Sequence, residues 1–193
     1  MRGLAFPALI LFLALTQQPA QQHKDWRGIL PLHSTRTDVE RLLGPPSPPP
    51  KDGIMAFPNG EGSSCYFIEN QVVRIAFVTN TALEQAGCSS FPLGTVIGVE
   101  VYLKDRPSLS DLQIDLAKFE TLDPSTPPNI GFKAYIDSDD GLDICTQDGR
   151  VNKLVYYGDA RDTQPCPKLA GNPKEFCNLT VDFLPRQEEQ KKH

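Results

Sequence analysis

The stretch STRTDVERLLGPP, residues 34–46, predicts a short helix with a defined start and end. Thr37 is followed three residues later by Glu40, a spacing typical of a helix cap. The apolar residues of this helix share one face: Val39, Leu42 and Leu43. Gly44 and the two prolines after it end the helix. Because a helix of about ten residues is marginal alone in water, its apolar face must pack against another part of the fold.

The same arrangement returns in SLSDLQIDLAKF, residues 108–119, where Ser108 and Asp111 supply the cap of a second predicted helix. Its apolar residues also recur at helical spacing: Leu109, Leu112, Leu116 and Phe119. The segments that follow the two predicted helices align as well, with residues 65–78 on residues 144–157. This alignment places Val72 on Val151, Arg74 on Lys153, Ile75 on Leu154 and Phe77 on Tyr156. We therefore expect an internal duplication.

Each predicted helix precedes short runs rich in Val, Ile, Tyr and Phe that are separated by turn residues, the pattern of antiparallel strands. In the first half the predicted strands are 54–57, 64–68, 72–79 and 95–103, and in the second they are 132–136, 142–146, 151–157 and 178–184. Glu69-Asn70 and Asp148-Gly149 are the hairpin signals. The predicted fold is α+β, with two tandem modules that each pack a short helix on a four-stranded antiparallel sheet. The modules span residues 27–104 and 105–185, and a polar, disordered tail is expected at 186–193.

The first twenty residues, MRGLAFPALILFLALTQQPA, have the pattern of a secretory signal peptide. Arg2 precedes an apolar run from Leu4 to Leu15, which is too short for a membrane span of ~20 residues. The rest of the chain is acidic, because the whole sequence has a net charge of -5 and the first twenty residues contribute a single base. Nucleic acid and anionic lipid repel an acidic protein. We expect a secreted or periplasmic protein without nucleic-acid partners and without stable membrane insertion of the mature chain.

The five cysteines suit an oxidising compartment: Cys65, Cys88, Cys145, Cys166 and Cys177. No two of them have the C-x-x-C spacing of a zinc ribbon or a thioredoxin-type pair. One arrangement that respects the duplication pairs Cys65 with Cys88 and Cys145 with Cys166, and leaves Cys177 free. A second arrangement pairs Cys166 with Cys177. Cys65 and Cys145 are also open to interpretation as small buried core residues.

Motifs for catalysis or for cofactor binding are scarce in this sequence. His33 has no partner at the spacing of a catalytic triad, so we interpret it as a surface residue beside the first helix. The acidic run 137–143 does not fit an EF-hand, because Gly141 and Leu142 stand at the fifth and sixth loop positions, and a hairpin turn is the better interpretation. Phosphate-binding glycine loops and a G-x-S-x-G motif are absent. We predict no catalytic, cofactor-binding or metal residues, and we expect Trp26 to plug the edge of the first module.

The pattern Thr35-Arg36-x-Asp38-Val39-x-x-Leu42-Leu43-Gly44-x-Pro46 resembles a helix-and-turn signature of small secreted envelope proteins. Among these are the outer-membrane assembly lipoproteins of the SmpA/OmlA type, in which the signature leads into an antiparallel sheet. A tandem form of such a unit is similar to the β-lactamase inhibitory proteins, which bind an enzyme across a concave sheet. The whole chain also resembles uncharacterised secreted bacterial proteins. The lipidated Cys of the lipoproteins has no counterpart after the apolar run of this chain.

Together these patterns predict a non-catalytic protein-binding or envelope scaffold module. We expect it to meet another protein through its sheet surface or through a groove between the two modules, with open strand edges as a further possibility for docking. The resemblance to the inhibitory proteins implies an alternative, an inhibitor of a secreted hydrolase. A second alternative is an enzyme of unrecognised type that uses Asp or Glu residues of the second half.

Overall fold

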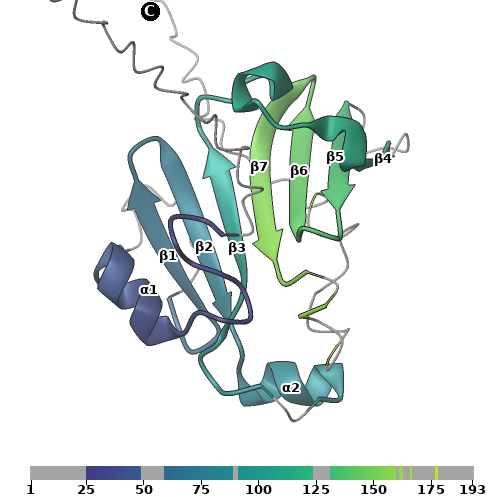
Figure 1. Ribbon diagram of the computed structural model, residues 1–193. Helices are drawn as coiled ribbons and strands as arrows, with labels where there is room; N and C mark the ends of the chain where they lie inside the picture. Colours follow the sequence, from purple (N-terminus) through teal and green to yellow (C-terminus); the bar gives the residue numbers. More distant parts are fainter. Residues whose placement is uncertain are drawn as a thin grey trace, which may run out of the picture.

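The computed structural model describes residues 25–48, 59–88, 91–123, 131–159, 161–162, 166 and 177 (Figure 1). The strands of this part of the chain are β1 Ser63–Ile68, β2 Gln71–Phe77, β3 Val96–Leu103, β4 Glu120–Leu122, β5 Phe132–Asp137, β6 Leu142–Gln147 and β7 Arg150–Tyr157. Its helices are α1 Arg36–Leu43 and α2 Asn80–Ala86, and it has two short 3-10 helices, η1 Leu109–Leu112 and η2 Leu116–Lys118. The predicted α+β class is confirmed.

The strands form one antiparallel sheet in the order β1-β2-β3-β7-β6-β5-β4. Glu69-Asn70 joins β1 to β2 and Asp148-Gly149 joins β6 to β7, as the sequence predicted. Both residues of the second turn have positive φ, which a type I′ hairpin turn requires. The predicted strands that fall on described residues are all found, within two residues of their predicted ends. The strands predicted at 54–57 and 178–184 lie outside the described residues, as do the signal peptide at 1–20 and the tail at 186–193.

The two tandem four-stranded modules are not confirmed, because strands from both predicted modules belong to the same sheet. β3 pairs with β2 on one side and with β7 on the other, so that Glu100 lies opposite Arg74 and also opposite Val155. The predicted boundary between residues 104 and 105 follows directly on the strand that joins the two halves.

The aligned hairpins β1–β2 and β6–β7 are not copies related by a rotation. β2 and β7 are both antiparallel to β3, so they run in the same direction. The aligned residues Ile75 and Leu154 also lie in one core cluster, on the same face of the sheet. However, β1 and β6 lie on opposite sides of their partner strands, since the order is β1-β2-β3-β7-β6. Suppose that β2 is superposed on β7 with the same direction and with the same side chains toward the core. Because L-residues fix the handedness of the strand, β1 then falls at the position of β3 and not at that of β6.

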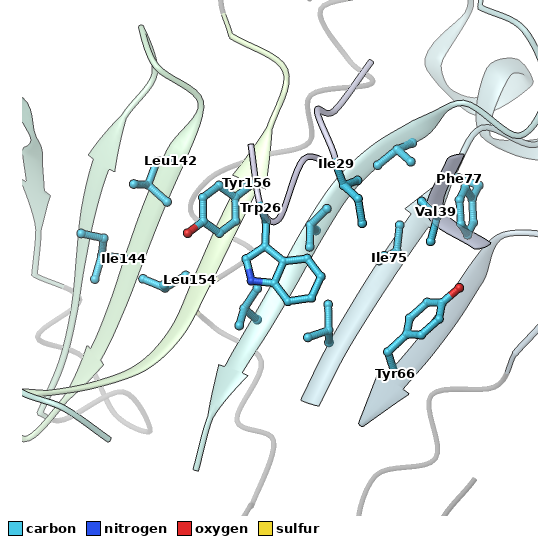
Figure 2. Packing of buried hydrophobic residues seen from close by; sticks show 14 of the residues in the cluster. Trp26, Ile29, Val39, Tyr66, Ile75, Phe77, Leu142, Ile144, Leu154 and Tyr156 are labelled. Atoms are coloured by element: carbon cyan, nitrogen blue, oxygen red, sulfur yellow. The ribbon is translucent and has the colours of Figure 1, made fainter. Parts of the chain in front are cut away.

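One face of the sheet carries the main core (Figure 2). Trp26 is 6% exposed and lies over the β3–β7 junction beside Tyr156, so it covers the middle of the sheet rather than the edge of a module. Ile29 and Val39, both fully buried, cover the β2–β3 side. The indole of Trp26 therefore packs in one cluster with residues of both predicted modules. Its burial contributes to one continuous core.

Helix α1 is bound to the sheet through its first turn and its apolar face. Its N-cap is Thr35, which forms a capping box with Asp38, so the predicted cap at Thr37 and Glu40 was wrong by two residues. The Arg36 guanidinium stacks on the Phe77 ring with 4.0 Å between its central carbon and the ring centroid, and it donates a hydrogen bond to Ser64 Oγ. Val39 is buried in the main core. The short helix therefore leans on β1 and β2.

The predicted helix at 108–119 is not an α-helix. The capping box of Ser108 and Asp111 is present, but it starts only η1, which ends where Gln113 takes the left-handed conformation. Asp115 then caps the separate turn η2. The reason lies in Ile114, which packs against the main core together with Leu109, Leu112, Leu116 and Phe119. At 100° per residue, one straight helix would point Ile114 away from those four, so the chain breaks to bury all five.

Two elements were not predicted. Helix α2 begins after Thr79, whose hydroxyl accepts from the backbone N–H of Ala82, and ends at Gly87 in the left-handed conformation. These are ordinary cap signals, but the helix has seven residues and no buried side chain, so its sequence lacks an apolar face. Strand β4 has three residues and pairs with Ala134–Ile136 of β5.

Candidate functional site

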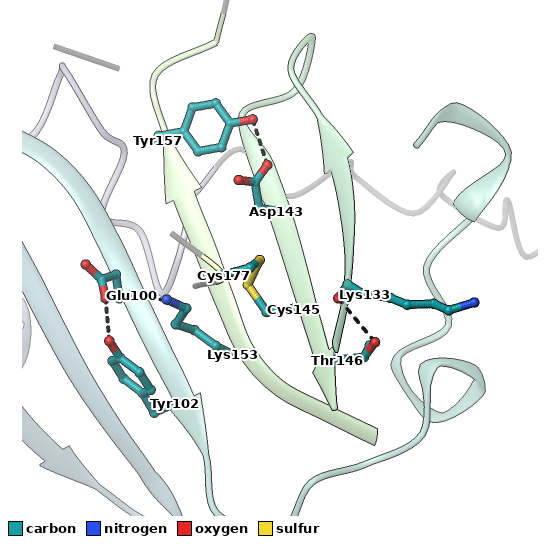
Figure 3. Close-up of a disulfide and its surroundings, with 9 residues drawn as sticks. All are labelled: Glu100, Tyr102, Lys133, Asp143, Cys145, Thr146, Lys153, Tyr157 and Cys177. Carbon is teal, nitrogen blue, oxygen red and sulfur yellow. Dashed lines mark hydrogen bonds and ion pairs between the residues drawn. A yellow bond between two sulfur atoms is a disulfide. The ribbon is translucent and has the colours of Figure 1, made fainter. Parts of the chain in front are cut away.

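The face of the sheet opposite Trp26 carries a buried group of charged side chains at the β3–β7 junction (Figure 3). Glu100 is 6% exposed, and its carboxylate lies 2.8 Å from Arg74 Nη1 and 4.0 Å from Lys153 Nζ. Tyr102 donates a hydrogen bond from its hydroxyl to Glu100 Oε2. Strand alternation places these side chains together, because the residues on either side of Glu100 point into the main core.

Burial controls the protonation of this cluster. Desolvation lowers the pKa of Lys153, although the carboxylate of Glu100 favours its charged form. Burial first, and then the charge of Glu100, raise the pKa of the Tyr102 hydroxyl far above its usual range. A buried carboxylate that faces two cations and a hydroxyl donor ties β2, β3 and β7 together.

A second buried carboxyl lies on the same face, on β6. Asp143 is fully buried and accepts a hydrogen bond from the Tyr157 hydroxyl at 2.8 Å. Desolvation raises the pKa of Asp143 to about 7, against the opposing effects of the Tyr157 hydrogen bond and of the charge on Lys153. We did not single out Asp143 from the sequence, because we interpreted the acidic run 137–143 as a solvent-exposed hairpin turn.

The middle of the acidic run, residues 138–141, forms the predicted hairpin turn between β5 and β6, whereas Asp137 ends β5 and Asp143 lies on β6. Asp137 Oδ1 accepts a hydrogen bond from the backbone N–H of Asp140, which is typical of a tight polar turn. Within the described residues, no group of three or more His, Cys, Asp or Glu side chains has a geometry that holds a metal ion.

The disulfides join Cys88 to Cys166 and Cys145 to Cys177. Both predicted arrangements were wrong: the first rested on the expected duplication, and the second paired Cys166 with Cys177, whereas each of these two cysteines has a different partner. Cys65 is the free cysteine of the described chain, buried beside Val72 and Tyr102, and burial raises the pKa of its thiol. Cys177 packs on the face that carries Asp143, in a cluster with Ala134, Ile136, Cys145, Val155 and Tyr157.

The expected open edge is closed at β1. The backbone N–H of Cys65 donates to Asn59 Oδ1, and its carbonyl accepts from the backbone N–H of Ser47. The N–H of Phe67 donates to Ser47 Oγ. These contacts satisfy the outward-facing groups in the middle of the strand, which protects a sheet edge from strand addition. The prediction of open edges was therefore wrong at β1.

His33 is a surface residue, as predicted, with half of its side chain exposed. It also has a partner that the sequence did not indicate: His33 Nε2 lies 3.1 Å from Asp162 Oδ1. Asp159 organises this turn by accepting from the backbone N–H groups of Arg161 and Asp162. The pair connects the N-terminal loop to the turn that follows β7.

The end of the sheet beside α2 carries an open hollow of about 420 Å³. One stripe of α2 and the residue after its cap line it: Asn80, Leu83, Glu84, Gly87 and Cys88. Leu93 lies next to the start of this helix, because the N–H of Gly94 donates to the carbonyl of Val78. The side chain of Leu93 is 55% exposed, more than that of Leu42 on α1 at 43%. Figure 1 shows α2 across this end of the sheet, apart from the core face. We call this surface, formed by the hollow and Leu93, the α2 surface.

Comparison with known proteins gives one distant similarity of fold. No protein-family profile matches the chain, and no curated protein matches its sequence. The crystal structure of YjgB, a DUF4309 family protein from Bacillus subtilis strain 168, is similar with a TM-score of 0.44 and 12% identity, over 72% of this chain and 86% of that chain. In the described part of the chain, no helix has the length and apolar character needed to cross a membrane.

Proposed function

We propose that this protein is a non-catalytic binding module outside the cytoplasm, and that it meets a partner protein with the α2 surface. The observation that carries the proposal is the presence of an open hollow and an exposed apolar side chain near one helix, α2: the half-buried Leu83 lines the hollow, and the exposed Leu93 lies near the start of the helix. Exposed apolar side chains next to polar groups are typical of protein interaction sites. Asn80 and Glu84 supply those polar groups.

The rest of the molecule supports this choice of surface. One sheet face is filled by the main core, the other holds buried charges and Cys177, and the β1 edge is satisfied by Ser47 and Asn59. The Cys88–Cys166 disulfide also fixes the end of the lining stripe, which reduces the entropy lost on binding. Two disulfides favour an oxidising compartment, and removal of residues 1–20 as a signal peptide is part of the proposal.

Affinity capture from the extracytoplasmic fraction of the native host tests this proposal. The baits are the full-length wild type, Leu93→Asp, and Leu42→Asp as a matched control at the other exposed leucine. We expect one partner to be recovered with the wild type and with Leu42→Asp, and at least tenfold less of it with Leu93→Asp. Equal recovery by all three baits, with the disulfides intact, would place the partner elsewhere on the surface.

A further inference from the structure

The carboxyl group of Asp143 is buried with one oxygen unsatisfied. Oδ1 accepts the Tyr157 hydrogen bond, whereas Oδ2 has no hydrogen-bond partner in the described structure. In the ionised form, the buried negative charge is costly to desolvate, and Tyr157 is the one neutral donor among the described residues that stabilises it. In the protonated form, the carboxyl carries no charge, so this cost is absent. The site therefore distinguishes strongly between the two forms of the side chain.

Each neighbouring strand presents a different group to Asp143. β7 supplies the Tyr157 hydroxyl and the ammonium of Lys153, and β5 supplies Asp137, which is 6% exposed and has a like charge. On β6 itself, the next residue on the same face is Cys145, which is uncharged in its disulfide with Cys177. Figure 3 shows Asp143 and the disulfide along one face of β6.

Lys153 cannot fully compensate Asp143, because a second carboxylate competes for it. Its Nζ lies 4.0 Å from Glu100, and Glu100 is the larger of the two influences on the pKa of Lys153. Arg74 Nη1, at 2.8 Å, adds a further cation on the far side of Glu100. The ionic cluster is thus centred on β3, and Asp143 lies at its margin.

We propose that Asp143 is a proton-dependent switch of this face: neutral, it keeps β6 and β7 packed together beside the Cys145–Cys177 disulfide, and ionised, it loosens that packing. This inference is independent of the proposed binding function. Burial raises the pKa of Asp143 to about 7 from 3.8, so its neutral form stabilises the fold fully below pH 3.8. That stabilisation is lost as pH rises through about 7. Lys153 has the opposite trend at alkaline pH, because its pKa is lowered from 10.5.

Hydrogen exchange of the oxidised full-length protein tests the switch. We expect protection of β6 and β7 amides, corrected for intrinsic exchange, to fall at least tenfold between pH 5 and pH 8 relative to β1 and β2 amides. Asp143→Asn keeps an acceptor for Tyr157 but cannot ionise, so its protection of β6 and β7 should not change over this range. Asp123→Asn, at an exposed acid that pairs with Lys133, is the control and should behave as the wild type. The same fall in the wild type and in Asp143→Asn, or no fall in the wild type, would overturn the inference.

A second variant separates a switch from a merely structural contact. Tyr157→Phe removes the donor that favours ionised Asp143, so the midpoint of the transition should move to higher pH. A structural role alone would lower protection equally at every pH. Should Asp143→Asn not fold, carbon-13 NMR of the wild type decides the question: a carboxyl that titrates near pH 7 and shifts upward in Tyr157→Phe supports the switch, and its absence overturns it.

Discussion

The guanidinium of Arg74 on β2 lies 2.8 Å from the carboxylate of Glu100 on β3, whose side chain is 8% exposed. Glu100→Ala would remove the carboxylate that lies between Arg74 and the almost fully buried Lys153. We expect a loss of about 3–5 kcal/mol in the free energy of unfolding, the range for breaking a buried ion pair. Urea unfolding of the oxidised protein at pH 7 measures it.

Glu69→Ala is the matched control, because Glu69 pairs with Arg27 at 3.2 Å in an exposed position. This substitution should cost less than about 1 kcal/mol, as is usual for surface ion pairs. Similar losses for both variants would mean that the buried cluster contributes no more than a surface pair.

Gly141 and Gly149 both have positive φ, but they differ in the space around them. A methyl group at Gly141 would clash with the carbonyl oxygen of Tyr157, while at Gly149 it would meet nothing within 4 Å. We expect Gly149→Ala to cost about 1–2 kcal/mol through backbone strain alone. Gly141→Ala should cost at least about 2 kcal/mol more. Thermal melts of both variants compare them, and equal melting temperatures would contradict the close approach.

The N-cap of α1 is testable at two neighbouring threonines. Thr35→Ala should destabilise the protein by about 1 kcal/mol, because Thr35 accepts from the backbone N–H of Asp38. Thr37→Ala should be nearly neutral, since Thr37 is exposed inside the helix. Asp38 Oδ2 in turn accepts hydrogen bonds from the backbone N–H and the hydroxyl of Thr35, and these, the backbone one first, lower the pKa of Asp38 to about 2 from 3.8. Stability from this carboxylate is therefore present above pH 3.8 and lost as pH falls through about 2.

Peptide mapping without reduction should recover Cys88 linked to Cys166 and Cys145 linked to Cys177. Cys65 should react with a thiol reagent only after unfolding, because it is 3% exposed and its thiol pKa is raised. Cys88–Cys166 closes the longer loop, with a sequence separation of 78 against 32, so its removal should cost more in the chain-entropy account. A Cys65–Cys88 peptide would contradict the described connectivity.

Local chemistry made much of the fold predictable. Gly44 ends α1, Asp148-Gly149 makes the β6–β7 turn, and alternating apolar residues such as Val73 and Ile75 set strand faces. The helix predicted at 108–119 failed for a tertiary reason, because the core takes Ile114 as well as the residues at helical spacing. Helix α2 was missed because it lies on the surface and buries no side chain, so its sequence has no apolar face that would predict a helix.

Long-range pairing was not predictable from these patterns. β3 pairs with β7 although Glu100 and Val155 are far apart in sequence, and the residues of neither strand indicate which strand it pairs with. The disulfides depend on that pairing, so their connectivity was missed as well. The buried cluster did leave a trace: Arg74 and Glu100 are the single charges of β2 and β3, and Lys153 is a charge in the interior of β7. A charge in such a position points either to a free face or to a buried partner.

Site-specific crosslinking from position 93 tests the central claim, that the α2 surface meets a partner protein, most directly. A photoreactive side chain replaces Leu93 in the full-length chain, and the same side chain at the exposed position 42 serves as the reference. The account predicts one discrete protein adduct in the native extracytoplasmic fraction from position 93, which is lost when Leu83→Asp is added, and none from position 42. An adduct from position 42 alone, or one from position 93 that survives Leu83→Asp, would contradict it.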